Sequence, residues 1–139
     1  MSQNIEKVAV LGGGVMGAQI AGHLANAGIP SYLFDINDEL AKNGVGSLTS
    51  LKPAPLYKPK NAELVTSCTY DNDIEKIAEV DWVLEAVVER LDIKEKVYNN
   101  LLPHLKDTAI LTSNTSGIPL TDLTSSLPDD VKQRFMITH

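Results

Sequence analysis

The stretch VAVLGGGVMGAQIAG, residues 8–22, decides the fold of this chain. A short apolar run, typical of a buried strand, leads directly into three glycines at the spacing G-x-G-x-x-G and then into a helical pattern. Each glycine meets a different demand: a tight turn at Gly12, close backbone approach to a pyrophosphate at Gly14, and close packing of helix on strand at Gly17. The stretch therefore predicts a strand, turn and helix that present backbone N–H groups to an anion, although three glycines in six residues also suit any tight turn from strand to helix.

The helix of this unit is predicted to begin at about Val15 and to end at Ala27, because Gly28 and Pro30 form a common glycine-then-proline exit. The first turn of a helix carries free N–H groups and the positive end of the helix dipole. We therefore expect Val15 and Met16 to contact a bound anion together with the glycines.

Five further apolar runs alternate with helical patterns along the chain. The runs are short and rich in β-branched residues, and they occupy residues 31–34, 63–67, 81–88, 109–113 and 134–138. Helices are expected from Asn37 toward Leu51, over residues 91–105, where Ile93, Val97, Leu101 and Leu105 form an apolar stripe, and over residues 120–126. The proline-rich residues 51–61 are expected to form a surface loop. This alternation predicts an α/β fold with a doubly wound, mostly parallel sheet of about six strands.

Composition narrows the class of function. The chain has 139 residues, enough for one domain, with 12 Lys and Arg against 18 Asp and Glu. No cluster of basic residues suits a nucleic-acid backbone, no apolar run reaches membrane-span length, and no group of residues suggests a metal site. The polar N-terminus is unlike a secretory signal, and the single Cys68 excludes an internal disulfide. We expect a cytoplasmic protein.

Asp35 closes the second predicted strand, about 20 residues after the glycine loop. A carboxylate at this place accepts hydrogen bonds from the adenosine ribose of a dinucleotide. Taken alone, Asp35 also suits a turn or a helix cap. Because the carboxylate would repel a 2′-phosphate and neither Ile36 nor Asn37 is an arginine, the sequence favours NAD over NADP as cofactor.

Polar residues also follow the later strands, and ligands of open parallel sheets bind at the carboxyl ends of strands. Glu89 and Lys94 follow the fourth strand, although helix-start electrostatics and a solvated lysine explain them equally. Glu85, inside that strand, is assigned no role beyond packing or a local hydrogen bond.

The fifth strand runs into TSNTSG, residues 112–117, where Asn114 and Ser116 are candidate ligand contacts and helix capping is the alternative. The last predicted strand leads to His139. A histidine can act as a general base near neutral pH, but a terminal histidine can equally be a disordered end.

These motifs together resemble the NAD-binding domain of the 3-hydroxyacyl-CoA dehydrogenases, enzymes of fatty-acid β-oxidation. The resemblance covers nearly the whole chain through KVAVLGGGVMGAQIAGHLANAG, DWVLEAVVERLDIKEKVY, TAILTSNTSGIPLTDL and RFMITH. It implies a Rossmann fold spanning residues 1–139, NAD as cofactor and an acyl-CoA substrate. The proline-bearing LKPAPLYKP is similar to the version found in bifunctional members that carry an enoyl-CoA hydratase domain.

The resemblance also implies roles for single residues. His139 corresponds to the general base and Ser116 to the hydroxyl that hydrogen-bonds the substrate oxygen, while Asp35, Glu89 and Lys94 correspond to cofactor contacts. The chain departs from the family pattern by stopping at His139. The carboxylate partner of the histidine, a substrate-binding asparagine and the helical C-terminal domain, which typically carries oligomerisation, would lie downstream. We therefore expect a fragment, truncated after the sixth strand, that binds NAD but turns over little substrate.

Two alternatives stay open from the sequence. The chain could belong to a different dehydrogenase of the same broad fold that acts on a hydroxy acid or a sugar acid. It could also be a nucleotide-binding module without catalytic activity.

Overall fold

The computed structural model of the chain describes residues 5–12, 14–50, 59–115, 117–125 and 127–138. Its centre is a six-stranded sheet in which every neighbouring pair of strands is parallel. The strands are β1 (Val8–Leu11), β2 (Ser31–Asp35), β3 (Val65–Thr69), β4 (Trp82–Glu85), β5 (Ile110–Ser113) and β6 (Phe135–Ile137). The predicted six-stranded parallel sheet is confirmed.

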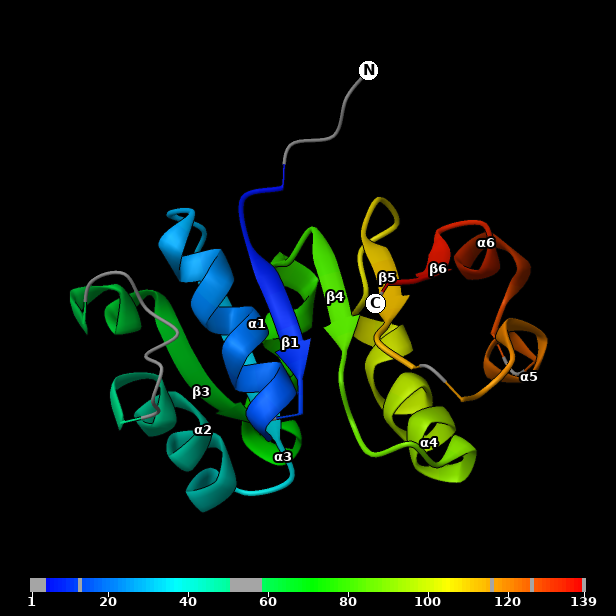
Figure 1. The fold of residues 1–139 in the computed structure, drawn as a ribbon. Coiled ribbons are helices and arrows are strands. Elements are labelled where there is room, and N and C mark those ends of the chain that lie inside the picture. Colours follow the sequence, from blue (N-terminus) through cyan, green and yellow to red (C-terminus); the bar gives the residue numbers. More distant parts are fainter. Residues whose placement is uncertain (1–4, 13, 51–58, 116, 126, 139) are drawn as a thin grey trace.

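The strand order is β3-β2-β1-β4-β5-β6, so β1 lies in the middle of the sheet. The chain first builds outward from β1 through β2 to β3, then returns to the other side of β1 and builds outward through β4 to β6 (Figure 1). The direction of winding reverses between β1 and β4. In open parallel sheets a crevice forms at this reversal, beyond the carboxyl ends of the strands, and ligands bind there.

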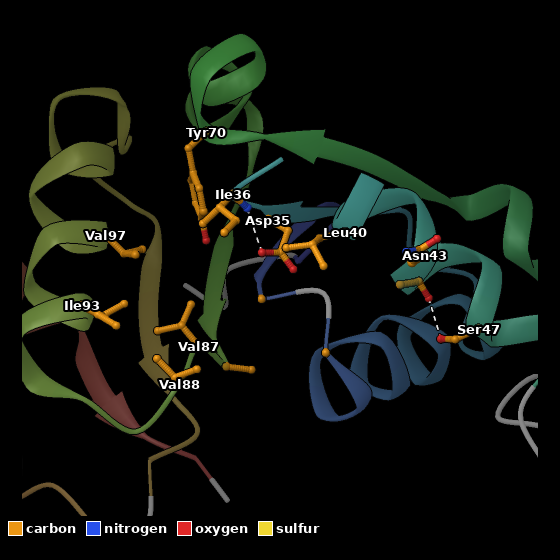
Figure 2. A pocket seen from close by; sticks show the side chains of 14 residues that line it. Asp35, Ile36, Leu40, Asn43, Ser47, Tyr70, Val87, Val88, Ile93 and Val97 are labelled. Atoms are coloured by element: carbon orange, nitrogen blue, oxygen red, sulfur yellow. Dashed lines mark hydrogen bonds between the residues drawn. The ribbon is translucent and has the colours of Figure 1, made fainter. Parts of the chain in front are cut away.

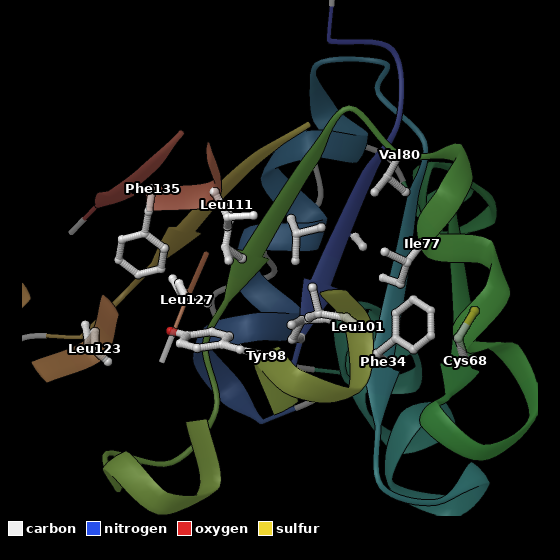
Figure 3. Close-up of a cluster of buried hydrophobic side chains, with 14 residues drawn as sticks. Phe34, Cys68, Ile77, Val80, Tyr98, Leu101, Leu111, Leu123, Leu127 and Phe135 are labelled. Atoms are coloured by element: carbon white, nitrogen blue, oxygen red, sulfur yellow. The ribbon is translucent and has the colours of Figure 1, made fainter. Parts of the chain in front are cut away.

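Two groups of helices cover the two faces of the sheet. One core packs α1 (Val15–Asn26) and α2 (Asp38–Ser50) on Val8, Val10 and Leu33 of the strands. The other core, drawn in Figure 3, packs the alternate strand residues Ala9, Leu11 and Phe34 against the opposite helical layer. That layer consists of α3 (Tyr70–Asp73), η2 (Ile74–Glu79), α4 (Leu91–Leu101), η3 (Leu102–His104), α5 (Leu120–Thr124) and α6 (Asp129–Lys132).

Several predicted element boundaries are confirmed. The first helix begins at Val15, and the backbone N–H of Leu40 donates to the Asn37 side chain at 2.9 Å, as expected of an N-cap before α2.

The fourth strand is shorter than predicted, since β4 stops at Glu85 and residues 86–90 form the loop into α4.

The predicted apolar stripe of the third long helix is only partly correct. Helix α4 ends at Leu101, and its most buried side chains are Lys94, Tyr98 and Leu101, while Ile93 and Val97 are half-buried. A polar contact inside the fold, described below, sets this rotation. The short helices α3, η2 and α6 were not predicted, because segments of four to six residues carry too little periodicity to be recognised.

Most of the predicted surface loop over residues 51–61 lies outside the described residues. The part that is described belongs to a 3₁₀ helix, η1 (Pro59–Leu64), which leads into β3. No helix within the described ranges combines the length and the apolar character needed to cross a membrane.

Candidate functional site

A cavity of about 620 Å³ opens at the carboxyl ends of β1, β2 and β4 (Figure 2). Gly12 and Gly14 of the loop after β1 line it together with Asp35 at the end of β2. This is the position at which the direction of winding reverses, so the fold brings the glycine loop and the acidic residue to one site. The volume lies in the range of small-molecule and cofactor pockets.

The glycine loop fits a phosphate cradle for specific steric reasons. Gly12 has φ +107°, and a Cβ there would lie 2.7 Å from the carbonyl oxygen of Ala86. A Cβ at Gly17 would overlap the carbonyl oxygen of Gly12. At Gly14, by contrast, a Cβ would meet nothing within 4 Å, so the backbone there stands open to a ligand.

Helix α1 leaves its N-terminus available to an anion. Its N-cap residue, Gly14, has no side chain that could occupy the free N–H groups, and its first turn carries no acidic residue. An anion placed beside Gly14 would face the positive end of the helix dipole. This arrangement fits a pyrophosphate, which the backbone at Gly12 and Gly14 would approach, while Gly17 allows α1 to pack closely against the loop.

Asp35 lies beside this loop in the same cavity. Its Oδ1 accepts the backbone N–H of Ile36 at 2.8 Å, which holds the carboxylate in place at the start of the turn. The remaining wall of the cavity is mostly apolar, with side chains from α2 on one side and from the β4–α4 loop and α4 on the other. The apolar side chains are Leu40 of α2, Ile36 just before it, Tyr70 of α3, Val87 and Val88 of the β4–α4 loop, and Ile93 and Val97 of α4.

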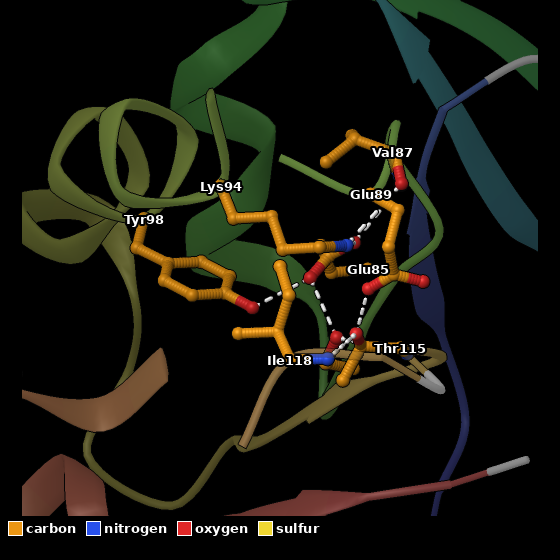
Figure 4. A network of polar contacts seen from close by, with 8 residues as sticks. Glu85, Val87, Glu89, Lys94, Tyr98, Thr115 and Ile118 are labelled. Atoms are coloured by element: carbon orange, nitrogen blue, oxygen red, sulfur yellow. Dashed lines mark hydrogen bonds and ion pairs between the residues drawn. The ribbon is translucent and has the colours of Figure 1, made fainter. Parts of the chain in front are cut away.

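A buried carboxylate organises the neighbouring loops. Glu85 has no exposed surface, and its two carboxylate oxygens accept four hydrogen bonds (Figure 4). Oε1 accepts the hydroxyls of Tyr98 at 2.6 Å and Ser113 at 2.7 Å. Oε2 accepts the ammonium of Lys94 at 2.6 Å and the backbone N–H of Val87 at 2.9 Å. Glu85 thus joins β4, β5, α4 and the loop between β4 and α4.

Tyr98 serves this network as a hydrogen-bond donor. Burial, and after it the nearby Glu85 carboxylate, raises the pKa of the Tyr98 hydroxyl well above its ordinary value. The phenol therefore stays protonated at neutral pH and donates to the carboxylate. This contact requires Tyr98 to face inward and so fixes the rotation of α4 noted above.

Lys94 is not the solvated lysine that the sequence allowed as an alternative. Its side chain is 2% exposed, and its Nζ contacts Glu85 Oε2 and, at 3.2 Å, the carbonyl oxygen of Val87. Through these two contacts Lys94 holds the β4–α4 loop, which lines the cavity, in position. Any contact between Lys94 and a cofactor stays a prediction.

Glu89 and Asn114 lie in the loops beyond β4 and β5. Glu89 is exposed and accepts a hydrogen bond from the hydroxyl of Thr115, which connects the two loops. Asn114 lines a second, smaller cavity of about 250 Å³ together with Met16 of α1 and Thr138 after β6. Of the predicted cofactor residues, Gly12, Gly14 and Asp35 line the larger cavity and Met16 and Asn114 the smaller one, whereas Gly17, Glu89 and Lys94 line neither.

The two predicted catalytic residues, Ser116 and His139, lie outside the described residues. Thr138 is described, and its backbone N–H donates to the carbonyl oxygen of Ser113 at 2.8 Å, so the chain leaves β6 alongside the end of β5. The catalytic assignments of Ser116 and His139 stay predictions.

The sequence did not identify Glu85 or Tyr70 as site residues. A carboxylate within an otherwise apolar strand pattern signals a buried network, but it does not name its partners. Tyr70 follows β3, and only the strand order brings the end of β3 to the same edge as the glycine loop.

A parallel sheet in this strand order, with a glycine loop and an acidic residue at its reversal point, defines the class of dinucleotide-binding Rossmann domains. A family profile described as "3-hydroxyacyl-CoA dehydrogenase, NAD binding domain" matches residues 7–139. The chain belongs to this family, and NAD is the cofactor of its domain.

Relatives agree with this membership. The chain is 41% identical over 142 residues to a probable 3-hydroxyacyl-CoA dehydrogenase of Deinococcus radiodurans, covering 97% of this chain and 41% of that protein. It is 40% identical over 146 residues to a putative fatty acid oxidation complex trifunctional enzyme of Rickettsia felis, covering 100% of this chain and 20% of that protein.

A solved structure supports the same membership. The crystal structure of a 3-hydroxybutyryl-CoA dehydrogenase from Escherichia coli matches with a TM-score of 0.83 and 27% identity over 99% of this chain and 30% of that one. The chain therefore spans between about a fifth and two fifths of the length of these relatives.

Proposed function

We propose that this chain is the NAD-binding part of a longer protein that oxidises 3-hydroxyacyl-CoA to 3-ketoacyl-CoA. The observation that carries the proposal is the meeting of Gly12, Gly14 and Asp35 in one cavity. The activity of the whole protein is inferred from its family, because the chain covers only 20% of the Rickettsia relative and 41% of the Deinococcus relative.

The residues of the cavity divide the work of holding the cofactor. Gly12 and Gly14 let the backbone approach the pyrophosphate, and Gly17 lets α1 begin close to the loop. Asp35 accepts hydrogen bonds from the hydroxyls of the adenosine ribose. NAD, when bound, supplies the acceptor for the hydride that leaves carbon 3 of the substrate. Glu89, Lys94, Asn114, Val15 and Met16 complete the proposed set of cofactor contacts.

His139 and Ser116 are the proposed catalytic residues. In the family motif that these positions match, the histidine removes the proton of the 3-hydroxyl group and the serine hydroxyl hydrogen-bonds the substrate oxygen. A carboxylate elsewhere in the whole protein would hold the imidazole in its working tautomer and stabilise the imidazolium. The 139-residue chain alone therefore binds NAD but oxidises hydroxyacyl-CoA poorly or not at all.

The choice of NAD over NADP rests on Asp35, whose carboxylate would repel a 2′-phosphate. The test is a titration of the chain and its Asp35→Asn variant with NADH and with NADPH. The variant is expected to bind NADH about 10- to 100-fold more weakly, because a hydrogen bond to a charged group contributes about 1.5 to 3 kcal/mol. The ratio of its dissociation constants for NADPH and NADH should also become smaller than in the unaltered chain.

Asp38→Asn is the matched control, because Asp38 is a second carboxylate of the same turn that pairs with Lys42 and does not line the cavity. It should leave both affinities unchanged. Equal binding of NADH and NADPH by the unaltered chain would contradict the role of Asp35.

The substrate is tested on the whole protein. NADH formation should be fast with 3-hydroxybutyryl-CoA and negligible with small hydroxy acids that lack coenzyme A. The reverse preference would favour a hydroxy-acid dehydrogenase, and the absence of any turnover would favour a binding module. An acyl-CoA substrate, a cytoplasmic location and an oligomer of the whole protein are parts of the same proposal.

A further inference from the structure

The side chain of Tyr70 carries a polar group that the fold itself does not use. The hydroxyl oxygen of Tyr70 is buried and has no hydrogen-bond partner in the part of the chain that the structure describes. A buried hydroxyl left unpaired loses its hydrogen bonds to water without replacing them, so such groups are uncommon unless another molecule satisfies them. Ser31 is in the same state, but it lines neither cavity.

Tyr70 is positioned to meet a ligand. It is the first residue of α3, directly after β3, and it lines the cavity that contains Asp35. Its ring stacks on Phe34 of β2 with centroids 5.7 Å apart, and Figure 2 shows its hydroxyl end directed into the cavity. The stacked ring is held in place, so the direction of the hydroxyl is built into the fold.

The hydroxyl is a donor under physiological conditions. Burial, and after it the negative charges of Asp35 and Glu85, raises the pKa of Tyr70 well above its ordinary value. A phenol that keeps its proton can donate that proton to a hydrogen-bond acceptor. The expected partner is therefore an acceptor atom of a ligand.

The surrounding wall defines which part of the cofactor this is. Asp35 is assigned to the ribose hydroxyls, and the space beyond it is walled by apolar side chains of α2, α4 and the β4–α4 loop, among them Leu40, Val88 and Val97. Such walls suit a flat, weakly solvated ring. The adenine base is flat and carries ring nitrogens that accept hydrogen bonds at its edge.

We propose that Tyr70 is a cofactor-binding residue whose hydroxyl donates a hydrogen bond to a ring nitrogen of the adenine base of NAD. This inference rests on the proposed function and adds a recognition contact for the base, in addition to those for the pyrophosphate and the ribose. It makes Tyr70 a determinant of selectivity for adenine dinucleotides.

The first test compares Tyr70→Phe with the unaltered chain. Removal of the hydroxyl should weaken NADH and AMP binding by between about twofold and tenfold each, which is the usual net contribution of one hydrogen bond. The melting temperature of the unliganded variant should stay the same or rise, because an unpaired buried group is removed. A purely structural role would lower the melting temperature instead.

Tyr32→Phe is the matched control. The hydroxyl of Tyr32 donates to Glu79 at 3.0 Å and accepts from Lys7 at 3.3 Å, and Tyr32 does not line the cavity. Its removal should leave NADH and AMP affinities unchanged.

The second test identifies the acceptor atom. AMP analogues in which N1, N3 or N7 is replaced by carbon are competed against NADH on both proteins. One analogue should bind the unaltered chain as weakly as AMP binds Tyr70→Phe and lose nothing further in the variant, which is the signature of a shared contact.

The outcomes separate the two proposals. Normal NADH binding by the chain with an unchanged affinity in Tyr70→Phe would overturn the role of Tyr70 alone, and so would additive losses for all three analogues. A chain that fails to bind NADH at all would overturn the proposed function as well.

Discussion

At the scale of single residues, the glycines of the loop do different work, and the structure separates them. Gly12 is required by its positive φ and by the nearby Ala86 carbonyl, and Gly17 is required because its Cα lies against the Gly12 carbonyl. Gly14 has free space around it, so its absent side chain matters to the ligand and not to the fold.

Gly17→Ala should therefore destabilise the chain. The added methyl group would overlap backbone, which cannot move without opening the turn, and overpacking of this kind costs about 1 to 3 kcal/mol. Urea denaturation followed by circular dichroism measures the loss.

Gly46→Ala is the control for Gly17→Ala. Gly46 lies within α2 with nothing within 4 Å of an added Cβ, and alanine is the better helix former by about 1 kcal/mol. This variant should be more stable than the parent. Equal stability of Gly17→Ala and the parent would contradict the packing role.

The sequence was sufficient to locate some of these residues but not others. Gly12, Gly14 and Asp35 were predictable, because their roles depend on local spacing and on the strand, turn and helix order. Tyr70 was not, because its importance depends on β3 lying beside β2 and on a hydroxyl that finds no partner among the described residues, and neither feature leaves a local pattern.

At the scale of elements, Glu85 holds the loop after β4 to the end of β5 and to α4. Glu85→Gln keeps the shape but leaves the ammonium of Lys94 buried without its counter-charge. Breaking a buried pair in this way costs about 3 to 5 kcal/mol. Chemical denaturation should show a loss of that size in the unfolding free energy.

A thermodynamic cycle tests whether the ion pair is responsible. Adding Lys94→Met to Glu85→Gln removes the orphaned charge and should recover much of the lost stability. Asp92→Asn is the exposed counterpart, because Asp92 pairs with Arg90 at the surface with both side chains 66% exposed. It should change stability by less than about 1 kcal/mol. A double variant as unstable as Glu85→Gln alone would contradict this assignment.

The same network explains where element prediction from sequence succeeded and failed. Strands and long helices were predictable from apolar runs and caps, as Asn37 illustrates. The buried face of α4 was not predictable in this way. Apolar periodicity places Ile93 and Val97 in the core and Lys94 in solvent, whereas hydrogen bonds to Glu85 hold Lys94 and Tyr98 in the interior.

At the scale of the whole molecule, Asp81 ties together the end of the sheet opposite the cavity. Its Oδ2 accepts the backbone N–H groups of Glu6 and Lys7, and its Oδ1 accepts the Lys106 ammonium at 2.6 Å. The hydrogen bond from Lys106, followed by that from the Glu6 backbone, lowers the pKa of Asp81 below its ordinary value. These contacts join the segment before β1 to the segments before β4 and β5.

Part of the loss of unfolding free energy at acidic pH should therefore come from the protonation of Asp81. Because the folded state lowers the pKa of Asp81, its contribution is complete above the ordinary aspartate pKa, near pH 4, and is lost as the pH falls through the lowered value. Asp81→Asn should reduce the unfolding free energy at pH 7 and flatten its decline below about pH 4. The exposed Asp107→Asn should leave the decline unchanged, and a decline equally steep in Asp81→Asn would contradict the assignment.

The central claim is that the chain is an NAD-binding domain with its site at the reversal point of the sheet. Calorimetric titration of the 139-residue chain with NADH, repeated with NADPH, tests it most directly. We predict one site per chain with a micromolar dissociation constant for NADH and much weaker binding of NADPH. A folded chain that releases no heat with NADH, or that binds both cofactors equally, would contradict the claim.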